Sequence, residues 1–274
     1  MSFKTLISAA ELRAVHDPLI LDCSFDLGDT SAGERAYAAG HIPGAFYLHL
    51  DRDLAGPKTG ADGSFLGRHP LPDREAFAAL LRRLGLRAGR QVVTVDAQGG
   101  MYAARAWWML RWLGHAEVAV LDGAWDGERT TDAPTPTPTD WQPGPALVQH
   151  IDAATLLKQL GQVRLVDARA AERFRGDVEP LDKAAGHIPG ATNRFFRDNL
   201  GPDGRFKPAA QLRAELAPLA TSAGGGTVVH QCGSGVTACH NLLAMAHAGL
   251  GDGLLYPGSW SEWSSDPARP IAKG

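Results

Sequence analysis

Cysteine is scarce in this sequence, and long apolar runs are missing. The 274 residues contain only three cysteines, Cys23, Cys232 and Cys239, too few for the disulfide framework of a secreted scaffold. No stretch reaches the roughly 18 consecutive apolar residues that a membrane span requires, and the first residues lack a charged segment followed by an apolar one. We therefore expect free thiols, a cytoplasmic location and no membrane association.

The charge is nearly balanced. Lys and Arg number 27 and Asp and Glu 30, for a net charge of -3. This balance gives no strong electrostatic attraction to nucleic acid, so we expect no nucleic-acid partner. The length and an apolar fraction of 44% suit a globular protein of two domains.

An internal repeat supports two domains. Gly40–Ala45 reads GHIPGA, and Gly186–Ala191 repeats it letter for letter. The match continues upstream, where Leu19–Asp22 parallels Arg164–Asp167, and downstream in the strand that precedes Cys232. A period near 146 residues is far longer than a solenoid repeat of about 20 to 50 residues, so the chain contains one fold twice. We expect the two GHIPGA histidines to hold tight turns rather than to act in catalysis.

A Pro/Thr-rich segment at residues 129–145 separates the copies. Its five prolines and five threonines predict a stiff, extended linker. We place the first domain at residues 1–128 and the second at 146–274. Within each, short apolar runs alternate with helical patterns, which predicts an α/β fold with a mainly parallel sheet flanked by helices. Ser8 and Asp152 precede helical patterns as N-caps.

Cys232 is the best candidate for a reactive group. The loop that starts at Cys232 and continues through Gly233, Ser234, Gly235, Val236 and Thr237 follows a strand and precedes a helix. Its glycines allow backbone N–H groups to form a nest, and the helix dipole points its positive end to the same place, so both favour a thiolate. An isolated cysteine is more often a small buried hydrophobe, which is our interpretation of Cys23 and Cys239. The neighbouring histidines lack zinc-ligand spacing, and we expect no metal and no other cofactor.

Together, the duplicated α/β domain, the paired GHIPGA segments and the CGSGVTA loop resemble the two-domain rhodanese family over nearly the whole chain. This resemblance implies two tandem rhodanese-like domains and a sulfurtransferase in which Cys232 carries a persulfide. Within the family, CGSGVTA is similar to the loop of 3-mercaptopyruvate sulfurtransferases, whereas thiosulfate sulfurtransferases have Arg and Lys where this chain has Gly233 and Ser234. Asp96 aligns with Cys232 in the first copy and cannot carry sulfur, so the first domain is expected to be catalytically silent.

The resemblance also implies further site residues. Ser234, His69 and Asp51 match a Ser-His-Asp relay that handles the proton. Arg173 matches an arginine that holds the donor carboxylate, and Arg175, Arg194 and Arg197 are the candidates for a second one. The family's other donor arginine aligns with Leu181, which leaves the choice between mercaptopyruvate and thiosulfate open.

Other functions remain as alternatives. A phosphatase loop of this architecture would need an arginine at Ala238, and a non-catalytic sulfur-sensing module would not need to keep Cys232 and its full loop. We expect the acceptor to be a thiol, such as thioredoxin or a small thiol, or cyanide, and the protein to be a monomer.

Overall fold

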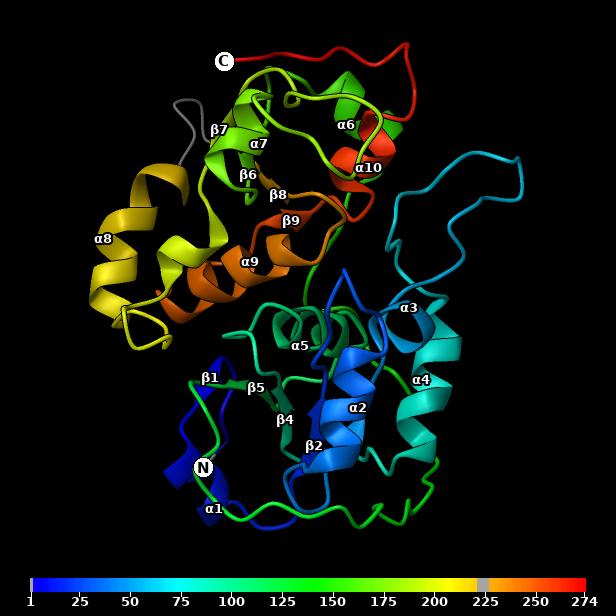
Figure 1. Cartoon of the computed structure of the whole chain (residues 1–274), viewed down its shortest axis with the longest axis vertical. Helices are drawn as coiled ribbons and strands as arrows, with labels where there is room; N and C mark the ends of the chain where they lie inside the picture. Colours follow the sequence, from blue (N-terminus) through cyan, green and yellow to red (C-terminus); the bar gives the residue numbers. More distant parts are fainter. Residues whose placement is uncertain (1, 221–226) are drawn as a thin grey trace. The chain divides into compact units, whose positions relative to one another are not determined.

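The computed structural model describes residues 2–220 and 227–274 and divides into two compact units (Figure 1). The first unit comprises Met1–Gly56, Leu71–Leu147 and Pro202–Phe206. The second comprises Pro57–Pro70, Val148–Gly201 and Lys207–Gly274. The segment Pro57–Pro70 therefore belongs to the second unit, although it lies among residues 1–128 in the sequence.

The first unit is built on a parallel sheet with the strand order β1-β5-β4-β2-β3. Its elements are β1 (Leu6–Ile7), α1 (Ala9–Ala14), β2 (Leu19–Asp22), α2 (Ala32–Ala39), β3 (Phe46–Tyr47), α3 (Leu50–Asp53), α4 (Arg74–Arg83), β4 (Val92–Val95), α5 (Ala103–Trp112) and β5 (Val118–Leu121). Strand β4 consists of buried β-branched residues, as expected for a strand covered on both faces.

The second unit repeats this sheet with the strand order β7-β6-β8-β9, again with parallel pairing. Its elements are α6 (Ala153–Lys158), β6 (Arg164–Asp167), α7 (Ala171–Arg175), β7 (Ala191–Asn193), the 3-10 helix η1 (Phe196–Asn199), α8 (Ala209–Ala220), β8 (Val228–Gln231), α9 (Thr237–His247), β9 (Leu254–Leu255) and α10 (Ser259–Trp263). Helix α9 packs against β8 and β9 (Figure 1).

The two sheets have the same topology. Strands β2, β3, β4 and β5 of the first unit correspond to β6, β7, β8 and β9 of the second. The edge position of β1 is represented in the second unit by a single parallel bridge from His150 to Leu255. The α/β fold, its parallel sheets and its duplication, predicted from the sequence, are thus confirmed. The predicted N-caps are also confirmed, because Ser8 accepts the N–H of Glu11 in a capping box and Asp152 accepts that of Thr155.

The Pro/Thr-rich segment 129–145 forms neither helix nor strand. It is nevertheless bonded along the first unit: the Thr139 N–H donates to Arg82 O at 3.0 Å, and the Gly144 N–H donates to Leu113 O at 2.9 Å. These hydrogen bonds hold the segment against the first unit, and its role as a stiff, extended linker stays a prediction.

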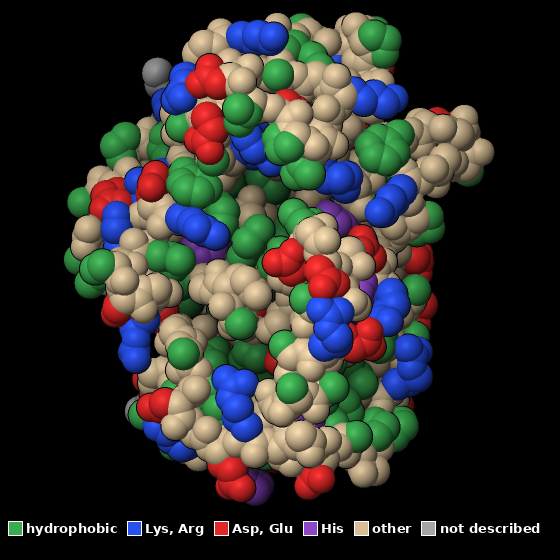
Figure 2. Space-filling model, in the orientation of Figure 1, with side chains coloured by type: hydrophobic (Ala, Val, Ile, Leu, Met, Phe, Trp, Pro, Cys, Tyr) green, Lys and Arg blue, Asp and Glu red, His purple; other side chains and the backbone are tan. Residues whose placement is uncertain are grey.

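The charge on the surface and the hydropathy of the helices both bear on possible partners. Basic and acidic side chains intermingle on the face drawn in Figure 2, which agrees with the balanced composition. Among the described residues, no helix has the length and apolar character needed to cross a bilayer.

Candidate active site

Cys232 follows β8 directly and precedes α9, so it lies at the carboxyl end of a central strand. Ligand sites in open α/β sheets form at this edge. Gly235 has φ +75°, in the left-handed region, and Val236 is right-handed. Alternating handedness turns successive N–H groups toward one point, which makes an anion-binding nest at the start of α9.

Helix α10 holds the backbone of the Cys232 loop through hydrogen bonds. The Cys232 N–H donates to Ser259 Oγ at 3.1 Å, and Cys232 O accepts the Trp260 N–H at 2.9 Å. Gly233 O in turn accepts the Ser261 N–H at 2.9 Å. Ser259 adopts φ +53°, an uncommon conformation for a residue with a side chain. These contacts fix the Cys232 backbone, and the side chain is 98% buried, as the relative exposure of 2% indicates.

Asp96 occupies the equivalent position in the first unit, after β4, and its surroundings reveal what such a loop binds. Its Oδ1 accepts the N–H groups of Gln98 and Gly100, both at 2.8 Å. Its Oδ2 accepts those of Tyr102 and Ala103, at 2.7 and 2.8 Å. Four backbone N–H groups therefore converge on one negatively charged side chain at the start of α5.

The position of that carboxylate is informative. An Asp Oδ is two bonds from Cβ, and so is the outer sulfur of a cysteine persulfide. In the first unit, the nest therefore binds negative charge two bonds from Cβ, which is the same number of bonds at which Cys232 would carry its second sulfur. The loop after Cys232 matches this one at Gly235, whose φ of +75° is close to the +70° of Gly99, but differs at the next residue, where Val236 has φ −88° and Gly100 has φ +87°.

The structure brings two of the predicted relay residues together. His69 Nδ1 lies 2.8 Å from Ser234 Oγ, and both side chains are buried. His69 reaches the loop because Pro57–Pro70 belongs to the second unit, where the Arg68 N–H donates to Ser261 Oγ at 3.1 Å. Asp51 lies on α3 of the first unit, with its N–H on His49 Nδ1. Its place in the relay stays a prediction.

Two arginines lie beside Gly233. A Cβ at this position would be 2.8 Å from Arg68 Nη2 and 3.5 Å from Arg173 Nη1. Arg173 had been predicted from the motif. Sequence reasoning missed Arg68, although its position next to His69 was a usable signal. Glycine at 233 leaves room for both guanidinium groups, where the arginine typical of thiosulfate enzymes would meet two cations.

Asp182 connects these two arginines. Its carboxylate forms ion pairs with Arg68 Nη1 and, at 3.1 Å, with Arg173 Nη2. Glu179 also pairs with Arg173, at 2.7 Å, and accepts the N–H groups of Leu181 and Asp182, which fixes the turn that carries them. Burial raises the pKa of the Asp182 carboxyl above its usual value, and the two arginines act against that rise.

The network continues into the core of the unit. Arg169 pairs with the fully buried Asp167 at 2.7 Å and with Glu179 at 3.5 Å. The Arg169 guanidinium lies 4.7 Å from the Trp260 ring centroid. The charge network of Arg68, Arg169 and Arg173 with Asp167, Glu179 and Asp182 therefore balances three positive charges with three negative ones.

Arg175, the other predicted donor-binding residue, pairs with Asp177 at 2.7 Å, and both side chains are about half exposed. A role for Arg175 stays a prediction, without support from these contacts. Cys23 and Cys239 are fully buried. Burial raises the pKa of the Cys23 thiol well above its usual value, which keeps it protonated and unreactive.

The GHIPGA histidines have structural contacts. His41 Nδ1 lies 2.8 Å from Tyr37 O, and its ring stacks on Tyr37. His187 makes the matching contacts with Phe174, at 2.9 Å. Their predicted turn-holding role agrees with this geometry.

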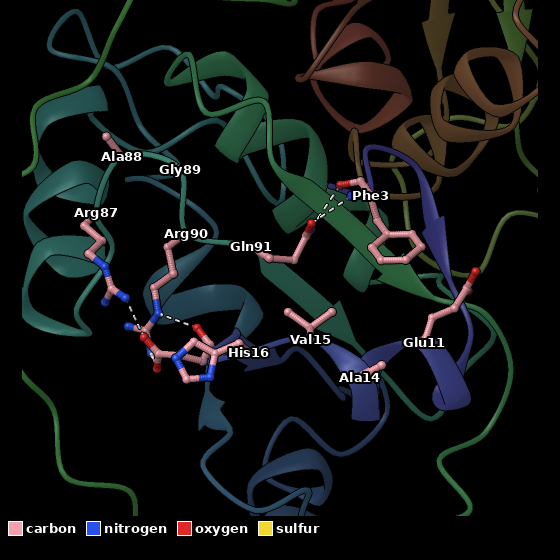
Figure 3. Close-up of a pocket in the computed structure, with 11 residues that line it drawn as sticks. Phe3, Glu11, Ala14, Val15, His16, Arg87, Ala88, Gly89, Arg90 and Gln91 are labelled. Carbon is pink, nitrogen blue, oxygen red and sulfur yellow. Dashed lines mark hydrogen bonds and ion pairs between the residues drawn. The ribbon is translucent and has the colours of Figure 1, made fainter. Parts of the chain in front are cut away.

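A separate cavity of about 620 Å³ lies in the first unit (Figure 3). Gln91, which lines the cavity, precedes β4, whereas Asp96 follows that strand. The cavity therefore lies at the amino end of β4, and the Asp96 loop lies at its carboxyl end. The Gln91 side chain points to the Phe3 backbone in Figure 3 and accepts its N–H at 2.8 Å. Arg87 and Arg90, at the same cavity, are paired with Asp17. Within the described ranges, no group of three or more His, Cys, Asp or Glu side chains is arranged to hold a metal ion.

Comparison with known proteins identifies the family. The family model "Rhodanese-like domain" matches residues 6–128 and 152–266. A Pseudomonas aeruginosa protein named "Probable 3-mercaptopyruvate sulfurtransferase" is 48% identical over the full length of both chains. A Mycobacterium tuberculosis protein that carries the name of a thiosulfate sulfurtransferase, SseB, is 42% identical over 99% of this chain and 98% of its own.

A solved structure of the same family also matches this chain. The 3-mercaptopyruvate sulfotransferase SseA of Escherichia coli superposes with a TM-score of 0.78 at 28% identity, over 94% of this chain and 100% of that one. The two family matches coincide with the two copies of the fold and include Cys232 in the second. The chain belongs to the rhodanese family.

Proposed function

We propose that this protein is a sulfurtransferase that takes sulfur from 3-mercaptopyruvate onto Cys232 and passes it to a thiol acceptor. The observation that carries the proposal is the pair of equivalent loops. In the first unit, four N–H groups bind an anion two bonds from Cβ at Asp96. In the second, the equivalent residue is Cys232, whose persulfide would place its outer sulfur the same number of bonds from Cβ. The names of the relatives support the same chemistry.

The reaction balances with the donor and the cysteine alone. The Cys232 thiolate attacks the donor sulfur, a new S–S bond forms, and the C–S bond breaks with its electron pair going to the pyruvate enolate. The proton of the donor thiol is transferred to the enolate carbon, which leaves pyruvate and an ionised persulfide. In this proposal the Ser234 hydroxyl relays that proton, and its contact of 2.8 Å with His69 Nδ1 supports this role. No separate cofactor is required.

Two observations bear on the choice of donor. Mercaptopyruvate needs a proton relay, and the buried Ser234–His69 pair supplies one. Thiosulfate needs positive charge and no relay, and Arg68 together with Arg173 beside Gly233 favours it as the second candidate. Because Asp182 already neutralises part of that charge, mercaptopyruvate is the donor we propose.

Acceptance of the sulfur needs only a nucleophile. A thiol of thioredoxin, a small thiol or cyanide attacks the outer sulfur, the S–S bond breaks, and Cys232 returns to its thiolate. We propose that a single chain suffices, because the Cys232 loop, His69 and the two arginines belong to one unit.

Steady-state turnover of the two donors tests the proposal. Ser234→Ala removes the relay, so kcat/KM for mercaptopyruvate should fall by about a hundredfold, the lower range for a proton-transfer group. Thiosulfate turnover should change far less, because sulfite leaves without a proton. Ser265→Thr, at a half-buried position on the turn after α10, keeps the hydroxyl that donates to Glu262 O and serves as a control that leaves both donors unaffected. Equal losses for both donors in Ser234→Ala would contradict the assigned relay.

A further inference from the structure

The geometry points to Arg68 as the second donor-binding arginine and to Asp182 as the residue that makes the site select a monoanionic donor over a dianionic one. This inference rests on the proposed function and deepens it. It concerns a cation that lies far from the motif arginine in sequence, and a carboxylate that no motif marks.

Arg68 supplies a second guanidinium beside Gly233. Position 181 holds a leucine, which is 48% exposed, and so supplies no cation. The guanidinium of Arg68, by contrast, lies on the same side of Gly233 as that of Arg173: a Cβ at this position would be 2.8 Å from Arg68 Nη2, closer than an ordinary contact, and 3.5 Å from Arg173 Nη1. Arg68 and Arg173 are 105 positions apart in the sequence. Both belong to the second unit, and together they supply one pair of guanidinium groups.

The two arginines keep donors available for a ligand. The Arg68 and Arg173 side chains are 21% and 18% exposed, whereas Asp182 between them is only 3% exposed. Solvent, and so a small anion, reaches the arginines while Asp182 lies beneath them. Among residues 2–220 and 227–274, no acceptor contacts the Nε atom of either arginine, although both atoms are buried. A guanidinium has five N–H donors, and the ion pairs with Asp182 and Glu179 use only part of them.

Asp182 sets the charge that a donor meets. Arg68 and Arg173 contribute two positive charges, and Asp182 and Glu179 contribute two negative ones, so this part of the charge network is neutral. Without the charge of Asp182, it would be +1. The gain from an added positive charge scales with the charge of the ligand, so a dianion such as thiosulfate gains twice the electrostatic free energy that a monoanion such as mercaptopyruvate gains.

Asp182→Asn is the decisive variant, because it keeps the shape of the side chain and removes its charge. For charges about 6 Å apart in a water-like medium, the added positive charge should raise the affinity of a monoanion about threefold and that of a dianion about tenfold. The preference for mercaptopyruvate over thiosulfate, taken as a ratio of kcat/KM values, should therefore fall about threefold. Arg68→Ala should lower kcat/KM for both donors, and more for thiosulfate.

Glu215→Gln is the matched control. Glu215 also bridges two cations, Arg194 at 2.7 Å and Lys207 at 3.0 Å, and its substitution changes the net charge of the protein by the same amount. It should leave the donor ratio unchanged. A donor ratio in Asp182→Asn equal to that in Glu215→Gln, or unchanged kinetics in Arg68→Ala, would overturn the inference.

A binding measurement separates this inference from the proposed chemistry. Calorimetric titration of the Cys232→Ser protein with pyruvate, a monoanion, and with sulfate, a dianion, requires no sulfur transfer. Adding Asp182→Asn should strengthen sulfate binding about three times more than pyruvate binding, and equal changes for the two anions would refute the selective role of Asp182. An enzyme that transfers sulfur from neither donor would contradict the proposed function instead, whatever the titrations give.

Discussion

Replacement of Gly235 by alanine tests whether the geometry of the loop matters for catalysis. Gly235 has φ +75°, and a Cβ there would lie 2.4 Å from Pro257 O and 2.9 Å from Pro257 Cα. Both neighbours are backbone atoms, which cannot rotate away. Pro257 precedes the turn into α10, the helix whose Ser259 and Trp260 hold the Cys232 backbone.

The cost has two parts. An L-residue in the left-handed region costs about 1 to 2 kcal/mol. The contact with Pro257 must then open by about 1 Å, since ordinary contact begins near 3.4 Å, and overpacking of this kind costs roughly 1 to 3 kcal/mol. We expect Gly235→Ala to lower the free energy of unfolding by about 2 to 5 kcal/mol in total. A displacement of about 1 Å in a reacting group should lower kcat about a hundredfold.

Gly161→Ala is the matched control. Gly161 lies in the same unit with φ +80°, but a Cβ there would meet no atom within 4 Å. Its substitution should therefore cost only the backbone part, about 1 to 2 kcal/mol, and leave turnover intact. Urea unfolding and donor turnover of both variants provide the comparison. If Gly235→Ala matches Gly161→Ala in both stability and activity, the argument that Pro257 and α10 fix the loop is wrong.

Two further predictions concern polar side chains, the half-buried Asp96 and the buried His230. Asp96→Asn removes an oxygen that accepts the Tyr102 and Ala103 N–H groups, so the free energy of unfolding should fall by about 2 to 3 kcal/mol. Asp126→Asn, at an exposed ion pair, should lower it far less. Equal urea midpoints for the two variants would contradict the nest. Burial lowers the pKa of His230 to about 4, so the unfolded state binds more protons below pH 6.5, and the free energy of unfolding should fall by about 2 kcal/mol from pH 7 to 5. His230→Leu should lack this component, and parallel pH profiles for the two proteins would refute it.

Local sequence predicted the features that depend on neighbouring residues. The loop at Cys232 was predicted correctly between a strand and a helix, because a β-branched run, glycines and an alanine-rich stretch follow one another along the chain. The duplicated sheet was predicted for the same reason, since each copy carries its own strand patterns. The Asp152 and Ser8 caps needed only residues three positions apart.

Contacts between distant segments were beyond local sequence reasoning. Arg68 and Asp182 are 114 positions apart, and nothing in either segment indicates the other. The hydrogen bonds that hold the Pro/Thr-rich segment, such as Thr139 to Arg82, likewise depend on tertiary packing. His69 could be assigned from the motif, but its placement in the second unit, against Ser234, could not be derived from its position within residues 1–128.

The central claim is that Cys232 carries the transferred sulfur, and mass spectrometry of the protein after incubation with 3-mercaptopyruvate tests it most directly. The account predicts the added mass of one sulfur atom on the peptide that contains Cys232, none on the buried Cys23 and Cys239, and loss of that mass when a dithiol acceptor is added. The Cys232→Ser protein should gain no sulfur. Sulfur on another cysteine, or no adduct with either mercaptopyruvate or thiosulfate, would contradict the account.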